Sequence, residues 1–404
     1  MKTTQQPTQL WNRSFIFCLC NNLFLFSYYF ALLTILPIYI MKDLGGTVQQ
    51  AGMALTLFLL SSIAIRPFSG MIVERFGKAR SVRISGLIFV ILAFSYLWID
   101  SMWSLLAIRF IHGFWFSILT TVNVPIVNDY IPDERKGSGM GYFVMSTNLG
   151  VVIGPFLALN IIQFASFQIL FALLACIVAV GYVFTWLIQI QENLVKSVQS
   201  SELASPKKSM QWHDVIETKV LAIGLIGLLT AFAYSSVMSF ITAYAEVKQL
   251  LAYTGAFFIV FAVSMLLVRP WVGKIYDSKG PNAVIYPSFI CFAIGLVIVS
   301  FLSNQWMLWI SAIFMGIGYG SVFPCLQTVA IQSVQKARMG HAISTFFTLF
   351  DIGLAVGSVM MGIFIAWVGF QATYIFCAVM VVFTLWVYRS LVAKKFKRSP
   401  LGAE

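Results

Sequence analysis

Long apolar segments, each followed by a short polar loop, form the main pattern along this chain. A helix that crosses the hydrocarbon core of a bilayer needs about 20 predominantly apolar residues, and twelve segments approach or exceed that length. The one long polar interruption, residues 191–217, contains Ser, Lys and Pro and predicts a solvated linker. The predicted spans are 14–40, 51–73, 84–99, 103–127, 139–162, 167–190, 220–243, 253–275, 283–302, 306–331, 341–367 and 371–391.

The same polar pattern occurs twice. The frame that begins at Arg66-Pro67 recurs at Arg269-Pro270, an offset of 203 positions (269 − 66 = 203). Both copies place a Gly four residues after the Arg, an acid four residues later and a second Gly three residues further on. The same offset relates Gly113 to Gly316, Arg135 to Arg338, Gly150 to Gly353 and Gly154 to Gly357. One offset that holds along the chain indicates an internal duplication.

This duplication in so apolar a chain predicts an all-α membrane protein. We expect 12 transmembrane helices in two pseudo-symmetric six-helix bundles, as in secondary transporters built from parallel repeats. The predicted domains are an N-terminal bundle (1–190), a cytoplasmic linker (191–217) and a C-terminal bundle with a short basic tail (218–404).

Composition and charge support a membrane location. Of the 404 residues 60% are hydrophobic and only 10% are charged, against about 25% charged in soluble domains. Among the 26 basic residues, only Lys42 and Lys248 fall in predicted outer loops, and Arg66, Arg109 and Arg269 fall within apolar segments. The others lie on one side, so the positive-inside rule predicts a multi-pass protein with both termini cytoplasmic. The lack of long extracellular loops and of sorting signals suits a bacterial inner membrane. The net charge of +12 forms no contiguous basic face, and we expect no nucleic-acid partner.

The repeated loop resembles the signature of the major facilitator superfamily between its second and third spans. The matching positions are Gly70, Glu74, Arg75, Gly77 and Lys78, with Ala79 where a second basic residue is usual, and the second-half copy keeps Gly273, Asp277 and Gly280. In that family the charged loop steadies the outward-facing state as a conformational latch across the cytoplasmic helix ends. Asp129, at the end of the fourth predicted span, is the expected partner. The alternative is that the basic residues only set topology.

The fifth predicted span resembles the motif of the 12-span drug:proton antiporter group. It matches at Gly141, Gly150, Gly154 and Pro155 and departs at Ala158 and Leu159. The match implies export, although the Gly spacing also serves close helix packing alone. The Arg-Pro-x-x-Gly frame, together with Phe350-Asp351-Ile352-Gly353 and Gly357, is similar to the metallophore-exporting branch of the family, which implies a siderophore-like substrate as one option.

Asp351 is the candidate for proton coupling. Among the 14 acidic residues it alone lies in the middle of a predicted span, where an unpaired carboxylate costs several kcal/mol. Ser344, Thr348, Asp351, Ala355 and Ser358 follow the spacing of one helix face, small and polar like a cavity wall. A carboxylate there can load and release a proton. The 203 offset places the uncharged Asn148 at the equivalent position, and a purely structural role for Asp351 stays open.

Further polar residues in the spans are candidates for the substrate cavity. Arg109 matches the family's fourth-span Arg motif and must find an acceptor or an anionic substrate group. His112, one turn later, is a second candidate for proton handling, or else a packing residue. Arg66 and Arg269 are expected to extend to the nearby interface, where long basic side chains reach water. The remaining cavity candidates are Asn22, Tyr28, Asn123, Asn148, Tyr234 and Tyr319.

These features favour one function and exclude several others. No Walker loop, catalytic cluster or metal-ligand spacing is present, so we expect no enzyme, no metal and no cofactor other than the proton gradient. The leading hypothesis is proton-coupled export of small, partly apolar molecules such as drugs, secondary metabolites or metallophores. The partners are then the substrate, protons and the lipid bilayer, and we expect a monomer. The alternatives are a proton symporter for a small anion held by Arg109, and a non-transporting membrane sensor.

Overall fold

Helices are the regular elements of the chain in the computed structural model, which describes residues 9–46, 48–190 and 216–393. Most of the expected linker and the basic tail from Lys394 onward lie outside the described residues. The helices are α1 (Arg13–Lys42), α2 (Val48–Phe76), α3 (Lys78–Ser95), α4 (Met102–Asp129), α5 (Lys136–Ile161), α6 (Phe167–Leu187), α8 (Leu221–Val247), α9 (Thr254–Lys279), α10 (Pro281–Ser300), α11 (Gln305–Gln332) and α12 (Met339–Leu391). Short 3-10 turns are η1 (Tyr96–Trp98), η2 (Asp133–Arg135), η4 (Thr218–Val220), η5 (Leu251–Tyr253) and η6 (Lys336–Arg338).

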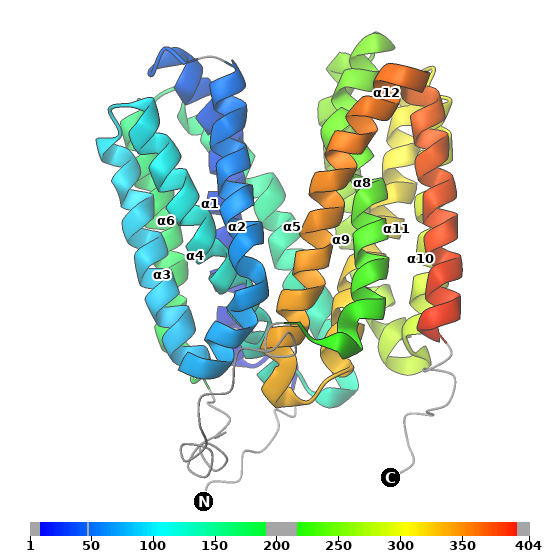
Figure 1. The fold of residues 1–404 in the computed structure, drawn as a ribbon, viewed down its shortest axis with the longest axis horizontal. Coiled ribbons are helices and arrows are strands. Elements are labelled where there is room, and N and C mark those ends of the chain that lie inside the picture. The colour runs from blue at the N-terminus through cyan, green and yellow to red at the C-terminus, as the bar shows by residue number, and fades with distance from the viewer. Residues whose placement is uncertain (1–8, 47, 191–215, 394–404) are drawn as a thin grey trace, which may run out of the picture. The chain divides into compact units, whose positions relative to one another are not determined.

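The last helix contains two spans. Among the described residues, eleven helices are long and apolar enough to cross a bilayer, and α12 is one of them with 53 residues. At about 1.5 Å per residue it would be about 80 Å long, against a hydrocarbon core of about 30 Å. Gly369 interrupts it with φ 80° and ψ 172°, and Figure 1 shows the chain reversing direction between its orange and red parts. The predicted spans 341–367 and 371–391 are therefore both present, and the twelve-span all-α fold is confirmed.

The described residues fall into two compact units. Unit 1 takes them from the ranges 1–132, 146–217 and 334–345, and unit 2 from 133–145, 218–333 and 346–404. The first part of α5 is thus counted with unit 2 and the first part of α12 with unit 1. In unit 1, α4 packs on α2 and α3, and α6 packs on α1 and α3. In unit 2, α11 packs on α9 and α10.

Both units use a glycine to bring the same pair of helices together. A Cβ built on Gly113 of α4 would lie 2.1 Å from the Phe58 carbonyl oxygen of α2. A Cβ on Gly316 of α11 would lie 2.6 Å from the Phe261 carbonyl oxygen of α9. Only glycine allows helix backbones this close. The 203 offset relates Gly113 to Gly316 and Phe58 to Phe261. The repeat in the sequence is therefore also a repeat of helix packing within each unit.

The second glycine of the repeated loop has a backbone role. Gly77 ends α2 and precedes α3 with φ 83°, and Gly280 ends α9 and precedes α10 with φ 79°. With ψ 158° and 174°, both lie in a region used almost only by glycine, which costs other residues about 1–3 kcal/mol. The reversal between these two helices therefore requires glycine in both halves.

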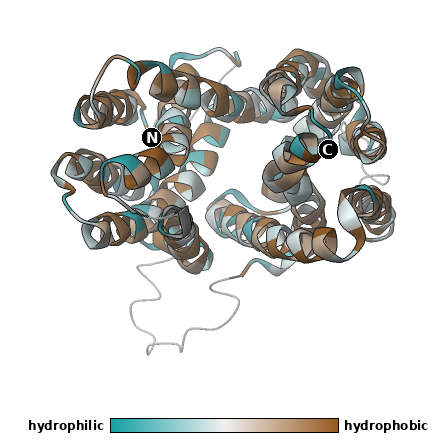
Figure 2. Ribbon diagram, turned by 90° about the horizontal axis from the view of Figure 1, so that it is seen from above, coloured by the Kyte–Doolittle hydropathy of each residue, from teal (hydrophilic) through white to brown (hydrophobic). Residues whose placement is uncertain are grey.

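The surface of each unit suits lipid. Figure 2 shows that hydrophobic positions dominate the helices. Large apolar side chains such as Leu60, Ile91 and Leu267 are more than half exposed. Tryptophans near helix ends, including Trp103 and Trp367, are more than four-fifths exposed, as expected of the aromatic belts at bilayer interfaces.

Candidate functional site

The structure brings three predicted site residues of unit 2 together. Tyr234 of α8 stacks on Tyr319 of α11, with ring centroids 3.6 Å apart and planes 11° apart. Asp351 of α12 lies within electrostatic range of Tyr319. Tyr319 is buried, whereas Tyr234 and Asp351 are half-buried. The group therefore combines one carboxylate with two aromatic faces, and Phe261 extends the stack beyond Tyr234 at 6.2 Å.

The polar face of α12 is separate from its packed face. Cβ atoms built on Gly353 and Gly357 would lie 2.2 Å and 2.8 Å from the Leu228 and Phe232 carbonyl oxygens of α8. The glycines therefore face α8 closely. Thr348 and Asp351 are half-buried and Ala355 is exposed, so the predicted cavity face of α12 is the less enclosed one within unit 2.

Arg109 and His112 lie in the aromatic interior of unit 1. The Arg109 Nε donates to the Ala54 carbonyl at 3.2 Å, and its guanidinium lies 4.2 Å from the centre of the Phe58 ring. The His112 ring centre is 4.0 Å from that of Phe89, and its Nδ1 is 3.4 Å from the Tyr96 hydroxyl. Arg109 is 1% exposed and His112 0%. Tyr28 is buried beside His112 in the same cluster.

The asparagines of unit 1 connect helices. Asn22 of α1 donates to Ser146 Oγ and Thr147 Oγ1 of α5, at 2.9 and 2.8 Å. Asn123 of α4 accepts from Asn21 at 3.4 Å. The half-buried Asn148 differs, because its Nδ2 has no acceptor among the residues that the structure describes. It thus keeps a donor available on α5.

The glycines of the predicted antiporter motif have two different surroundings. Cβ atoms on Gly150 and Gly154 would lie 2.8 Å from Ser27 N and 2.3 Å from Ser27 O of α1. These positions, followed by Pro155 within the helix, allow α5 to pack closely on α1. A Cβ on Gly141, by contrast, meets no atom within 4 Å.

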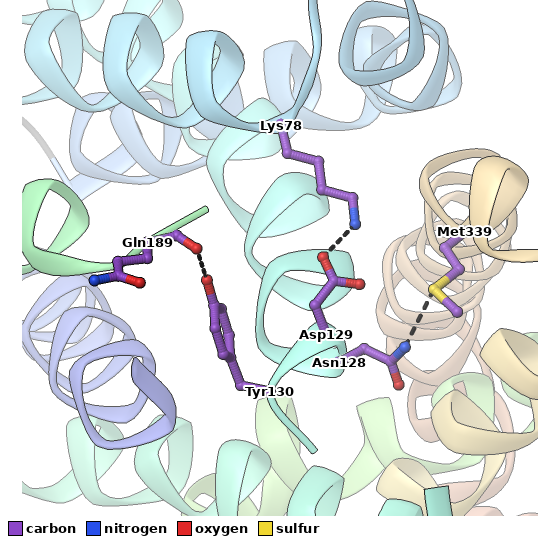
Figure 3. Close-up of polar contacts among 6 residues, drawn as sticks. All are labelled: Lys78, Asn128, Asp129, Tyr130, Gln189 and Met339. Atoms are coloured by element: carbon purple, nitrogen blue, oxygen red, sulfur yellow. Dashed lines mark hydrogen bonds and ion pairs between the residues drawn. The ribbon is translucent and has the colours of Figure 1, made fainter. Parts of the chain in front are cut away.

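The charged loop of unit 1 makes one ion pair and one carboxylate–imidazole contact. Figure 3 shows Lys78, at the start of α3, directed toward Asp129 at the end of α4, with Nζ and Oδ2 2.5 Å apart. Glu74 near the end of α2 pairs instead with His341 at the start of α12, with Oε2 and Nδ1 3.1 Å apart. A Cβ on Gly70 would lie 2.7 Å from the His341 Cα. Beside them, the Asn128 Nδ2 lies 3.3 Å from the Met339 Sδ.

The second copy of the loop makes the equivalent contact in unit 2 with different chemistry. The Asp277 carboxylate accepts from the Gly137 N–H at 2.7 Å, the Ser138 N–H at 3.1 Å and the Ser138 hydroxyl at 2.5 Å. A Cβ on Gly273 would lie 2.7 Å from the Ser138 Cα. The carboxylate therefore caps the first turn of α5, where unpaired N–H groups favour negative charge.

Sequence reasoning missed the partners of these acids. Glu74 contacts His341 and Asp277 contacts Ser138. The 203 offset relates Ser138 to His341 just as it relates Glu74 to Asp277, so the duplication could have predicted that the two acids contact equivalent positions. It also missed Glu217, whose Oε2 lies 2.5 Å from the Arg338 Nε and whose N–H donates to Thr345 Oγ1 at 2.9 Å. The local sequence around Glu217, Arg338 and Thr345 gives no sign that these residues are in contact.

The expectation that Arg66 and Arg269 reach an interface was wrong. Arg66 is 5% exposed and Arg269 2%. The Arg66 guanidinium donates to Thr120 Oγ1 at 3.2 Å and to Ser62 Oγ at 3.4 Å. Both side chains are buried because neighbouring helices cover that side of α2 and α9. The order of apolar and polar residues along the chain does not show which neighbours will do so.

The sequence of the chain is similar to those of known membrane transporters. Residues 17–358 and 288–403 match the Major Facilitator Superfamily. The chain is 24% identical over 365 residues to the multidrug resistance protein MdtG of Proteus mirabilis (strain HI4320), covering 87% of this chain and 88% of that protein. It is 23% identical over 369 residues to MdtG of Escherichia fergusonii, covering 87% of each.

Two solved structures share the fold. The human organic anion transporter MFSD10 (TETRAN) superposes with a TM-score of 0.77 at 14% identity, covering 93% of this chain and 98% of that chain. The transporter FucP gives a TM-score of 0.71 at 16% identity, covering 94% and 99%. Because the family model matches most of its length, the chain belongs to the Major Facilitator Superfamily and is a multi-pass membrane transporter, not an enzyme.

Proposed function

We propose that this transporter exports small, partly apolar molecules, such as drugs or secondary metabolites including metallophores, in exchange for protons. The observation on which this depends is the group formed by Asp351, Tyr319 and Tyr234 in unit 2. The relatives named multidrug resistance protein support the substrate class and the direction.

The chemistry of the group suits such an exchange. Stacked aromatic rings offer apolar faces and contribute little selectivity for any one solute. Asp351 is the one acidic position in mid-span, where ionised carboxylates are costly and tend to pair or take up a proton. Proton uptake by Asp351 removes a charge within electrostatic range of Tyr319, and release restores it. Substrate and proton can therefore each favour a different protonation state of this group.

The proposed transport mechanism, membrane location and energy source are those expected from the sequence. Alternating access between two pseudo-symmetric bundles is the mechanism expected of this fold. We place the protein in a bacterial inner membrane as a monomer, with both termini cytoplasmic, and with the proton gradient as its energy source. For the anion symport alternative Arg109 offers only part of its guanidinium: Nε donates to the Ala54 carbonyl and the group lies over the Phe58 ring, while Nη2 has no partner among the described residues.

The test is substitution of Asp351 in the purified chain reconstituted into vesicles. Asp351→Asn keeps the size but cannot exchange a proton, so proton-driven efflux should be lost while substrate counterflow continues. Asp351→Glu should retain partial activity with a shifted pH profile, because the titrating group remains. Asp100→Asn, an exposed acid before α4, is the control and should transport at the parental rate.

Two outcomes would contradict the proposal. A well-folded Asp351→Asn protein with undiminished proton-driven transport would remove Asp351 as the coupling group and direct attention to His112. A protein that fails to fold would indicate a structural carboxylate paired with a cation, since breaking such a buried pair costs about 3–5 kcal/mol.

A further inference from the structure

Arg269 is a buried cation that unit 2 leaves without an acceptor. It lies in α9, is 2% exposed, and its Nε, Nη1 and Nη2 are all buried with no hydrogen-bond partner among the described residues. An uncompensated buried charge costs several kcal/mol even after relaxation. A guanidinium cannot escape this cost by losing its proton. A buried cation of this kind therefore calls for a negatively charged partner.

Its counterpart in unit 1 shows what is missing. Arg66 is the equivalent residue of the repeated frame and donates to the hydroxyls of Thr120 and Ser62. The 203 offset replaces those two residues by Phe323 and Met265, which have no hydroxyl. Unit 2 thus keeps the cation and has lost the side chains that satisfy it in unit 1.

No carboxylate of the same helix replaces them. Asp277 lies eight residues along α9, about 12 Å at the helical rise, and its oxygens already bind Gly137 and Ser138. The titratable side chain within electrostatic range of Arg269 is Cys325. A thiol is a weak acceptor and a poor partner for a guanidinium.

Open space lies next to Gly141 of α5, at a height in unit 2 similar to that of Arg269. In unit 1 the Ser344 hydroxyl donates to the Arg66 carbonyl, and its equivalent in unit 2 is Gly141. Ser138 packs against Gly273. One turn further along each helix from that contact, Gly141 and Arg269 are at a similar height, but a Cβ on Gly141 would not touch Arg269 as Ser344 touches Arg66. Gly141 is buried, yet a Cβ there meets no atom within 4 Å. The missing side chain leaves open space at this position, called the hollow at Gly141 below.

We propose that Arg269 and the hollow at Gly141 form a binding site for a carboxylate group. The planar guanidinium presents paired N–H donors that match a carboxylate. One cation without other compensation selects a monovalent anion, because a dianion would leave net negative charge buried. The hollow at Gly141 admits the carboxylate of a short acid or the carboxylate end of a transported solute. This proposal does not rest on the direction or proton coupling of transport.

Thermal unfolding of the purified full-length chain in detergent tests the site. Ligands that bind only the native state raise the melting temperature as their concentration increases. Sodium acetate should raise it more than sodium chloride at equal ionic strength. Arg269→Met should abolish the acetate-specific rise. It should also melt at or above the parental temperature in chloride, because an uncompensated charge has been replaced by an apolar chain of similar length.

Two further variants separate binding from structure. Gly141→Leu retains Arg269 but fills the hollow, and should weaken the apparent acetate affinity at least tenfold. Arg66→Met is the matched control: it should lower the melting temperature, since it removes the bonds to Thr120 and Ser62, and keep the acetate-specific rise. Equal effects of acetate and chloride on the parent would overturn the proposal. So would a full acetate effect in Gly141→Leu, or an Arg269→Met protein destabilised equally in both salts.

Transport of benzoate into vesicles distinguishes the two sources of the carboxylate. If the group belongs to a transported solute, the parent moves benzoate and Arg269→Met does not. If it is a resident small anion, benzoate is not transported although acetate still raises the melting temperature. Loss of proton-driven export in Asp351→Asn with an intact acetate effect would affect only the proposed function, so the two proposals can fail separately.

Discussion

Asp277 is expected to determine how firmly the first turn of α5 is held in unit 2. Its three hydrogen bonds from Gly137 and Ser138 are of the charged kind that contribute about 1.5–3 kcal/mol each. The helix N-terminus adds about 0.3–1 kcal/mol. Because Asp277 is half-buried, water replaces part of this bonding when the carboxylate is removed. We therefore expect Asp277→Ala to lower the free energy of unfolding by about 3 kcal/mol.

A graded series tests that reasoning. Ser138→Ala removes only the hydroxyl bond and should cost about 1 kcal/mol, since both backbone bonds remain. Asp277→Asn keeps an acceptor oxygen without the charge and should fall between the two. Ser278→Ala is the control, because this exposed hydroxyl bonds only within its own helix, to the Lys274 carbonyl at 2.7 Å. Its effect should be close to zero.

The measurement is denaturation of the purified chain in detergent, alongside transport in vesicles. The reasoning is refuted if Ser138→Ala costs as much as Asp277→Ala, because the backbone bonds would then contribute nothing. It is equally refuted if Asp277→Ala unfolds like Ser278→Ala, because the carboxylate would then not hold α5 at all.

Two further predictions concern topology and the unit 1 loop. A reporter fused at Ser205, outside the described residues, should read cytoplasmic; a periplasmic signal would reverse the proposed orientation. Asp129→Asn and Glu74→Gln, which remove the partners of Lys78 and His341, should each slow transport about tenfold, or about 1.4 kcal/mol, with near-parental amounts of folded protein. Asp133→Asn, at a more exposed acid, is the control. Parental rates in both variants would show that the charged loop only sets topology.

The structure also separates two kinds of residue that look alike in the sequence. Arg109 and Arg269 are both lone arginines in apolar segments, yet Arg109 donates to a carbonyl and lies over a ring, whereas the Arg269 side chain has no hydrogen-bond partner among the described residues. Tyr28 and Tyr319 are both tyrosines in mid-span. Tyr28 packs beside His112 in an aromatic interior, whereas Tyr319 lies near the single mid-span carboxylate. A cavity assignment from polarity alone does not distinguish such pairs.

The sequence by itself determined the spans and the repeat. A helix in lipid must satisfy its own backbone hydrogen bonds, and bilayer thickness sets its length. Apolar segments therefore predict helices such as α4, observed at Met102–Asp129 against a predicted 103–127. The repeat also marked the glycines at 77 and 280, although their positive φ at the helix reversals was seen only in the structure.

The sequence had suggested Asp129 as a partner of the charged loop, and it pairs with Lys78, but only the tertiary structure decided the partners of Glu74 and Asp277. Glu74 pairs with His341 and Asp277 caps α5 because helices distant along the chain pack at Gly70 and Gly273. Arg269 is buried for the same reason. The apolar pattern records that a segment is a membrane helix, but not which of its faces contacts lipid and which contacts another helix. That choice depends on all the neighbouring helices at once, and it determines whether a charged side chain has a partner.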